Sequence, residues 1–497
     1  MKLKKVLVIM MALLLCIVPL TACTQGEGTG GASQAGTGEP PREVSLCMSQ
    51  IRWGISVDDT MMKLWTQAME EATNTKIEII APTHNDYMDK VNVLLSSGDY
   101  PDIIRPQQAW DYVSQFAVRG YLQPLTEHIN NDSRFAQLKD VDLSIYQSGS
   151  DYYGIPAGKG NCKIIWFRQD MTEKYGLNIK DVMTTDEFIT ELSKVDQSEV
   201  IPFSFPKHIV NFQLFYNFFG AYGGILPDDN GVYYDGIQTD EMKEALLWVK
   251  QLYDQGLMDS EFITNENANM REKLSAARAV SDIDYSARYT YYVQTAADVG
   301  VPTDFIPVYT LVGPDGGRGN LNESGGEAMC LSVTNKSVEA SLDIIDWLFF
   351  TKEGKLVDTV GLEGVHYDIA DGVLVGKESA VAAGYNPTPN ALSDGWAVLS
   401  TGELGFGFDG ISEEVLASQL EYTGIALDGQ NLGPLIKIPM GISSLYDENV
   451  ASYNSNLYEM ATKIVLGTQD IDTAYAEYAR FWSSIKGDEM LNQLNGK

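Results

Sequence analysis

The chain has 497 residues, of which 44% are hydrophobic and 21% are charged. That balance is typical of a folded globular protein and excludes a largely disordered chain. The 68 acidic and 35 basic residues leave a net charge of −33, which repels the phosphates of nucleic acids and of anionic lipids. We therefore expect no nucleic-acid partner, and the length allows two or three compact units.

The chain begins with the features of a secretory signal that ends in a lipid-attachment site. Three lysines precede a nearly unbroken apolar run from Val6 to Leu20, and a Thr-Ala-Cys sequence then ends at Cys23. The run is too short for an ordinary transmembrane helix, and small residues before a cysteine are typical of lipoprotein cleavage and thiol acylation. We expect removal of residues 1–22 as a lipoprotein signal peptide and acylation, by palmitate or a similar chain, at Cys23. The protein would then be extracytoplasmic and held at the cell membrane. The alternative is a plain signal peptide that happens to contain a cysteine.

Residues 23–43 are expected to form a flexible tether. The segment after the cysteine, TQGEGTGGASQAGTGEPPRE, is rich in Gly, Ser and Thr and shows no apolar period. Such a segment behaves as a random coil with a reach of about 20 to 30 Å. Its length, and the lack of Asp after Cys23, favour display on a Gram-positive surface, although the envelope type stays open.

Strands and helices are expected to alternate from Val44 onward. The sequence predicts a strand at Val44, a helix over 58–73, a strand over 76–80, and a helix that ends at Gly98. This alternation predicts an α/β protein with a parallel sheet. In the helix over 58–73, the predicted buried face is Met61, Leu64, Trp65, Ala68 and Ala72.

Two later helices have clear start signals. Thr239 precedes an apolar face that ends before Gly256, and Asp470 precedes a face that contains Tyr478 and Trp482. Helical spacing also predicts core positions for four of the eight tryptophans, namely Trp65, Trp248, Trp347 and Trp482.

No catalytic or metal-binding motif emerges from the sequence. The four histidines are widely separated, and HExxH, G-x-S-x-G and P-loop patterns are absent. The stretch DDNGVYYDG at 228–236 lacks the ligand pattern of a calcium loop and predicts a hairpin turn. GFGFDG at 405–410 has no strand leading into it, which disfavours a dinucleotide site. We expect no cofactor, no metal and no catalytic residue, although a glycosidase-type carboxylate pair stays possible.

Several fragments together resemble the bacterial extracellular solute-binding proteins of family 1, the receptors of ABC importers. They are SGDYPDI at 97–103, YYGIPAG at 152–158, KIIWFRQDM at 163–171, LYDQGLMDSEFI at 252–263, GLEGVHYD at 361–368 and KIVLGTQDIDTAYAEYARFW at 463–482. The resemblance covers roughly residues 44–490. It implies an α/β, two-lobed periplasmic-binding-protein-like fold (type II) with discontinuous lobes joined by crossing hinge strands. By this similarity, residues 44–159 plus 280–329 form the first lobe, and 160–279 plus 330–497 form the second.

The resemblance also implies a function. The protein would be a monomeric, non-enzymatic receptor that captures a carbohydrate, with an oligosaccharide as the expected ligand, by lobe closure and delivers it to ABC permease subunits. Two other classes stay open, an exported carbohydrate-active enzyme and a sensor or adhesion lipoprotein that binds a ligand without transport.

Nine residues are candidate ligand contacts, because ligands of open α/β sheets bind beyond the carboxyl ends of strands and aromatic faces stack on sugar rings. They are Trp53, Arg105, Trp110, Trp166, Asp282, Tyr285, Glu363, His366 and Trp396. For some of them a structural role is the alternative. Trp166 could pack within a hinge, and the segment with Glu363 and His366 could simply be a tight turn.

The mature cysteines are too few for a disulfide framework. Cys162 and Cys330 lie beside two expected crossings between lobes, so we expect them to be neighbours that could form a disulfide. Cys47, in the first strand, is expected to be a buried free thiol.

Overall fold

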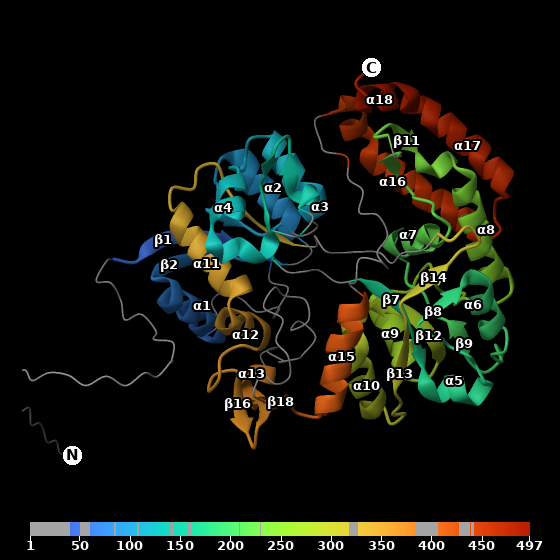
Figure 1. Ribbon diagram of the computed structural model, residues 1–497, viewed down its shortest axis with the longest axis horizontal. Helices are drawn as coiled ribbons and strands as arrows, with labels where there is room; N and C mark the ends of the chain where they lie inside the picture. Colours follow the sequence, from blue (N-terminus) through green and yellow to red (C-terminus); the bar gives the residue numbers. More distant parts are fainter. Residues whose placement is uncertain are drawn as a thin grey trace, which may run out of the picture. The chain divides into compact units, whose positions relative to one another are not determined.

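The computed structural model describes residues 40–49, 60–83, 86–106, 109–139, 141, 143–157, 162–207, 209–228, 230–317, 327–382, 406–426, 438 and 442–497. Two sheets, each with its own helices, account for most of these residues (Figure 1). None of the helices in the described ranges has both the length and the apolar character needed to cross a bilayer.

The first sheet has five strands. In spatial order they are β2 (Thr75–Ile80), β1 (Arg42–Cys47), β3 (Ile103–Ile104), β15 (Ala328–Leu331) and β6 (Ile155–Pro156). β1 is parallel to both of its neighbours, as the alternation of strands and helices predicts, whereas β15 is antiparallel to β3 and β6. β15 returns to this sheet from a point far along the chain, so the unit is discontinuous in sequence.

Helices and short elements complete this first unit. They are α1 (Thr60–Thr73), α2 (Tyr87–Ser97), α3 (Ala109–Val118), α4 (Thr126–Asn131), η2 (Ser133–Leu138), η3 (Ser144–Tyr146), the hairpin β4 (Gln147–Ser148) and β5 (Asp151–Tyr152), α11 (Val338–Phe350) and α12 (Lys352–Val360). One continuous apolar core joins the strands to α1, α2, α3 and α11. Gly98 ends α2 in the left-handed conformation with a φ of 86°, as predicted.

The buried face of α1 differs from the predicted one. Met62, Trp65 and Met69 point into the core, whereas Leu64 is 37% exposed. The prediction was right for Trp65 and wrong for Leu64 and Ala72, which are exposed, and it left out Met62 and Met69. Burial of a long methionine side chain removes more apolar area from water than burial of an alanine.

The second sheet has four strands. In spatial order they are β13 (Phe305–Val308), β7 (Lys163–Arg168), β12 (Ala279–Tyr285) and β9 (Ile201–Phe203). β7 runs antiparallel to both of its neighbours, and β12 is parallel to β9. β7 is buried along its whole length, and β12 is buried up to Asp284, so both sheet faces are covered.

Many further elements surround the second sheet. They are α5 (Gln169–Tyr175), β8 (Val182–Thr184), α6 (Thr185–Leu192), α7 (Ile209–Phe218), β10 (Ile225–Pro227), β11 (Tyr233–Asp235), η4 (Gly236–Gln238), α8 (Asp240–Asp254), α9 (Asn267–Ser275), η5 (Ser286–Arg288), α10 (Tyr289–Asp298), β14 (Thr310–Val312), α15 (Glu413–Ala426), α16 (Ser444–Val465), α17 (Ile471–Ser484) and α18 (Gly487–Leu494). α16 packs against α8, α17 and α18 (Figure 1). The predicted hairpin at 228–236 is confirmed by the pairing of β10 with β11.

Local signals predicted the caps and faces of two of these helices correctly. The hydroxyl of Thr239 accepts a hydrogen bond from the backbone N–H of Met242 at the start of α8. Asp470 caps α17 in the same way, through the N–H of Thr473. The four tryptophans predicted to be in the core are all buried.

A small third sheet contains β16 (Tyr367–Ala370), β17 (Val373–Gly376) and β18 (Gly407–Phe408), and α13 (Glu378–Ala382) follows β17. Its buried side chains pack with Val360 of α12 and Leu416 of α15. This sheet therefore lies on the chain segment that leads from α12 to α15.

Strand pairing divides the chain differently from the expected partition into 44–159 plus 280–329 and 160–279 plus 330–497. β12 and β13, expected in the first lobe, pair with β7 in the second sheet. Conversely, α11 and α12 follow β15 of the first sheet, and α11 packs on α1. Apolar patterning shows that a segment is a buried strand, but it does not show which of two sheets the strand joins.

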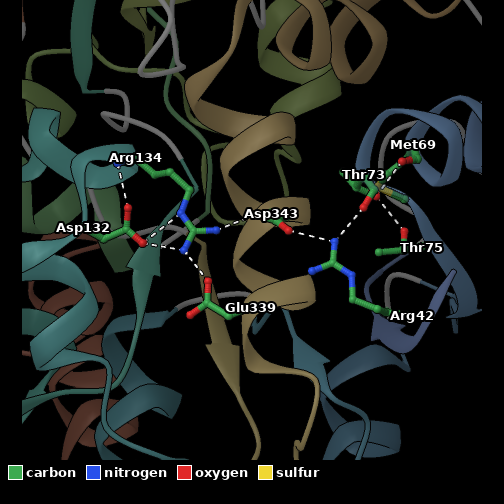
Figure 2. Close-up of polar contacts among 8 residues, drawn as sticks. All are labelled: Arg42, Met69, Thr73, Thr75, Asp132, Arg134, Glu339 and Asp343. Carbon is green, nitrogen blue, oxygen red and sulfur yellow. Dashed lines mark hydrogen bonds and ion pairs between the residues drawn. The ribbon is translucent and has the colours of Figure 1, made fainter. Parts of the chain in front are cut away.

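A network of charged side chains ties four elements of the first unit together (Figure 2). Nη1 of Arg134 in η2 lies 2.5 Å from Oδ1 of Asp343 in α11, and its Nη2 lies 2.8 Å from Oε2 of Glu339. Asp132 accepts from the same guanidinium at 2.5 Å. The other carboxylate oxygen of Asp343 accepts from Arg42 of β1 at 2.8 Å. Arg42 also donates to the carbonyl oxygen of Thr73 at the end of α1, so this network fixes the start of the first strand.

Cys47, Cys162 and Cys330 are all buried free thiols. For Cys47 this confirms the prediction, and burial raises the pKa of its thiol to about 11. The expected proximity of Cys162 and Cys330, which would have allowed a disulfide, is wrong. Cys162 lies 3.2 Å from the carbonyl oxygen of Ala426, whereas Cys330 sits in β15 opposite Ile104. Proximity to a chain crossing did not bring the two thiols together, since each packs in the core of a different sheet.

Candidate ligand-binding site

Cationic side chains and partly exposed aromatic rings lie together at the end of β12 in the second sheet. Tyr285 is the last residue of β12, is only partly buried, and lies opposite Lys163 at the start of β7. Nζ of Lys163 is 4.4 Å from the centroid of the Tyr285 ring. The guanidinium carbon of Arg288 is 5.9 Å from the same centroid and 5.7 Å from that of Tyr291 in α10. We call Lys163, Tyr285, Arg288 and Tyr291 the cation–aromatic cluster.

Trp166 packs beneath the surface next to this cluster. It is fully buried in β7, and its ring lies 6.0 Å from that of Tyr289, with 28° between the ring planes. Its Nε1 donates to the backbone carbonyl oxygen of Tyr285 at 3.2 Å. Trp166 therefore packs in the core and fixes the backbone of Tyr285, which is the packing alternative rather than direct stacking on a ligand.

Two buried carboxyl groups lie in the same strand. Oη of Tyr292 in α10 is 2.5 Å from Oδ2 of Asp282 and 2.9 Å from Oδ2 of Asp284. Arg271 of α9 donates twice to Asp284, at 2.6 and 2.9 Å. A tyrosine hydroxyl has one proton, so it can donate to only one of the two carboxylates. The other carboxyl group must itself be protonated to share a hydrogen bond with Tyr292.

The surroundings of the two carboxyl groups differ, and so do the shifts of their pKa values. Burial and the nearby charge of Asp284 raise the pKa of Asp282 well above its usual value. Burial alone would raise the pKa of Asp284 as well, but the hydrogen bonds and charge of Arg271 lower it below its usual value. The pKa values of the two carboxyl groups therefore shift in opposite directions, while the Tyr292 hydroxyl lies within hydrogen-bond distance of both.

Arg105 belongs to the first sheet and has a structural environment. It follows β3, is buried, forms an ion pair with Glu327 and places its guanidinium carbon 5.1 Å from the centroid of the Phe349 ring. Tyr87 donates a hydrogen bond to the Arg105 carbonyl oxygen at 2.8 Å. The strand-end position was predicted correctly, but the guanidinium is occupied by partners within the protein.

Glu363 and His366 lie in the turn that precedes β16. Nδ1 of His366 accepts the N–H of Leu362 at 2.8 Å, and its ring is buried. A side chain on Gly361 would come within 2.7 Å of that ring, and Gly361 has a φ of 91°. His366 therefore packs within a tight turn, which was the structural alternative for this segment. Glu363 is exposed in the same turn.

The remaining candidates cannot be placed with the cluster. Trp53 and Trp396 lie outside the described residues. Trp110 is in the first turn of α3, and its side chain is outside the described part.

The structure thus brings together Trp166, Asp282 and Tyr285, and it adds residues that the sequence analysis missed. Lys163 and Arg288 have a visible signal, namely a lysine that opens an otherwise apolar strand and an arginine within the aromatic run YSARYTYY. Among the side chains that the structure describes, no group of three or more His, Cys, Asp or Glu residues is arranged so that it could hold a metal ion.

Comparison with known proteins connects this architecture to a family. Residues 54–355 match the family described as "Bacterial extracellular solute-binding protein". The chain is 22% identical over 516 residues to "Lipoprotein LipO" of Bacillus subtilis (strain 168), covering 98% of this chain and 97% of that protein. It is 26% identical over 328 residues to a "Fructooligosaccharide ABC transporter substrate-binding protein FusA" of Streptococcus pneumoniae, covering 59% and 58%.

Solved structures show the same two-lobed fold. The alginate-binding protein AlgQ2 without calcium ion aligns with a TM-score of 0.66 at 21% identity, covering 92% of this chain and 97% of that one. S. pneumoniae FusA in complex with kestose aligns with a TM-score of 0.61 at 17% identity, covering 91% and 98%. The family match extends over more than half of the chain, from before α1 into α12. This chain therefore belongs to the bacterial extracellular solute-binding proteins.

Proposed function

We propose that the protein is the lipid-anchored receptor of an ABC importer and captures an oligosaccharide outside the cytoplasm. The cation–aromatic cluster at the end of β12 is the observation that carries the proposal. Partly exposed tyrosine rings offer flat apolar faces for sugar rings, and the adjacent cations can bind sugar oxygens. Relatives named for fructooligosaccharide transport and for polygalacturonan/rhamnogalacturonan binding support a carbohydrate ligand.

The mechanism we propose is a ligand-driven shift between open and closed arrangements of the two lobes. A ligand that contacts both lobes only in the closed arrangement binds that arrangement more tightly, and this difference drives closure. The closed receptor, acting as a monomer, would then be recognised by the permease subunits. No catalytic group is needed, and the buried carboxyl groups of β12 are engaged by Tyr292 and Arg271.

The test is binding of an oligosaccharide panel to the mature protein. A ligand that binds only the folded state raises the melting temperature, and calorimetric titration of each hit gives its affinity. We expect Tyr285→Ala to weaken binding of a hit at least tenfold, as for a truncated aromatic hot spot. Tyr175→Ala is the matched control, because Lys174 lies 4.7 Å from the Tyr175 ring on α5, away from the β12 end. Failure of every carbohydrate to bind would refute the proposed function.

A further inference from the structure

The charges around the end of β12 do not cancel. Arg271 neutralises Asp284 through two hydrogen bonds. Lys163 acts on both Asp282 and Asp284, and Arg288 acts on Asp284, so three cations share at most two carboxylates. The cluster has a net positive charge in a chain whose net charge is −33.

Lys163 is unusual among the buried cations. Its residue is only 3% exposed, yet within the described ranges no carboxylate lies within salt-bridge distance of its ammonium group. By contrast, the buried side chains of Arg168 and Lys273 pair with Asp170 and Asp259. Burial of an ammonium group without a counter-charge is costly, so such a group usually has an anionic partner.

Arg288 is similar but more accessible. It is partly exposed, and its guanidinium group lies near the two rings of Tyr285 and Tyr291. Among the described residues, neither cation forms a direct ion pair, although both lie close enough to Asp284 for their charges to lower its pKa. Arginine held against aromatic rings keeps its N–H groups free to bind a carboxylate in a bidentate way.

We infer that the ligand is an acidic oligosaccharide, whose uronate carboxylate is bound by Lys163 and Arg288 while its sugar rings contact Tyr285 and Tyr291. This inference rests on the proposed function, since it assigns a substrate class to the same site. A ligand carboxylate adds an anion at a site where cations outnumber carboxylates, and the aromatic rings supply the apolar faces.

The test compares acidic oligosaccharides with neutral forms of the same sugars. Oligogalacturonides and alginate oligosaccharides are titrated beside their methyl-esterified or carboxyl-reduced counterparts, at low and at about 0.3 M salt. We expect an acidic form to bind at least tenfold more tightly than its neutral counterpart and to lose affinity at high salt. Neutral forms that bind as well as the acidic ones would overturn the inference and leave the proposed function intact, whereas an absence of binding to any carbohydrate would refute the proposed function itself.

A pair of variants assigns the effect to the cluster. Arg288→Gln should weaken binding of the acidic form about tenfold and leave binding of a neutral form nearly unchanged. Arg278→Gln is the control, because Arg278 is exposed and pairs with Glu272, so the variant makes the same change in net charge elsewhere. Circular dichroism and the melting temperature check that both variants fold. Equal affinities of the two variants for the acidic form would show that the carboxylate binds elsewhere.

Discussion

The hydroxyl oxygen of Tyr292 lies 2.5 Å from Oδ2 of Asp282, and it also lies 2.9 Å from the second carboxylate of the strand. A contact this short between two oxygens is a strong hydrogen bond. The buried strand β12 therefore contains two aspartates with opposite pKa shifts, raised for Asp282 and lowered for Asp284, around one tyrosine hydroxyl.

This arrangement predicts an unusual pH dependence for Asp282. Its folded-state pKa is raised, so its stabilising contribution is full below the unfolded pKa of about 3.9 and is lost as pH rises toward the folded value. Asp282→Asn removes that loss. The variant should therefore gain stability relative to the wild type as pH rises from 4 to 7, by up to about 1.4 kcal/mol per pH unit. Urea denaturation at several pH values measures the difference.

The matched control is Asp284→Asn, for which the sign is opposite. The folded-state pKa of Asp284 is lowered, so its contribution is present above the unfolded pKa and is lost as pH falls. At pH 7 the variant should lose about 3 to 5 kcal/mol, because Arg271 is left without its buried partner. Equal pH slopes for the two variants would contradict the opposite shifts of the two pKa values. Lys163 of β7 also faces this pair, and both variants retain it, together with Tyr292 and Arg271.

The charged network around Arg134 should stabilise the first unit measurably (Figure 2). Removal of the guanidinium leaves Asp132, Glu339 and Asp343 close together without their shared cation. We expect Arg134→Ala to reduce the free energy of unfolding by about 1 to 2 kcal/mol, because the group is partly exposed. The loss should shrink at high salt. Lys243→Ala, whose partner Asp240 is on the surface, should cost less than about 0.5 kcal/mol in the same urea titration.

Close packing between α17 and α18 predicts a strong coupling between two residues. A Cβ on Gly487 would lie 2.0 Å from the indole ring of Trp482, which is 5% exposed. Gly487→Ala should cost about 1 to 3 kcal/mol through overpacking, and Trp482→Ala about 3 to 5 kcal/mol through a cavity. The double variant should cost less than the sum, since removal of the indole makes room for the methyl group. Strict additivity would show that the two side chains do not compete for this space.

The lipid attachment that we propose at Cys23 makes a prediction about location. Cys23→Ala should release the protein from membranes, because the acyl chains supply the anchor. The melting temperature should not change, since the substitution is separated from β1 by the tether. Membrane fractionation and calorimetry measure the two effects. A variant that stays in the membrane fraction would disprove anchoring through this cysteine.

Local sequence determined a good part of the fold. The caps of α8 and α17, the stop at Gly98 and the core positions of four tryptophans depend on residues a few positions apart, and the structure has them as predicted. These features follow from hydrogen bonds and side-chain spacing within a single helix, so neighbouring residues are enough to specify them.

Only the tertiary structure decided which sheet each strand joins and what faces each buried group. β12 reads as a buried strand in the sequence, but its pairing with β7 brings Lys163 against Tyr285 across more than a hundred residues. The same pairing places Trp166 in the core, and the pKa values of Asp282 and Asp284 shift in opposite directions. Strand pairing and charge compensation are long-range interactions, so a side chain's neighbours across the sheet, rather than its neighbours in sequence, determine its chemistry.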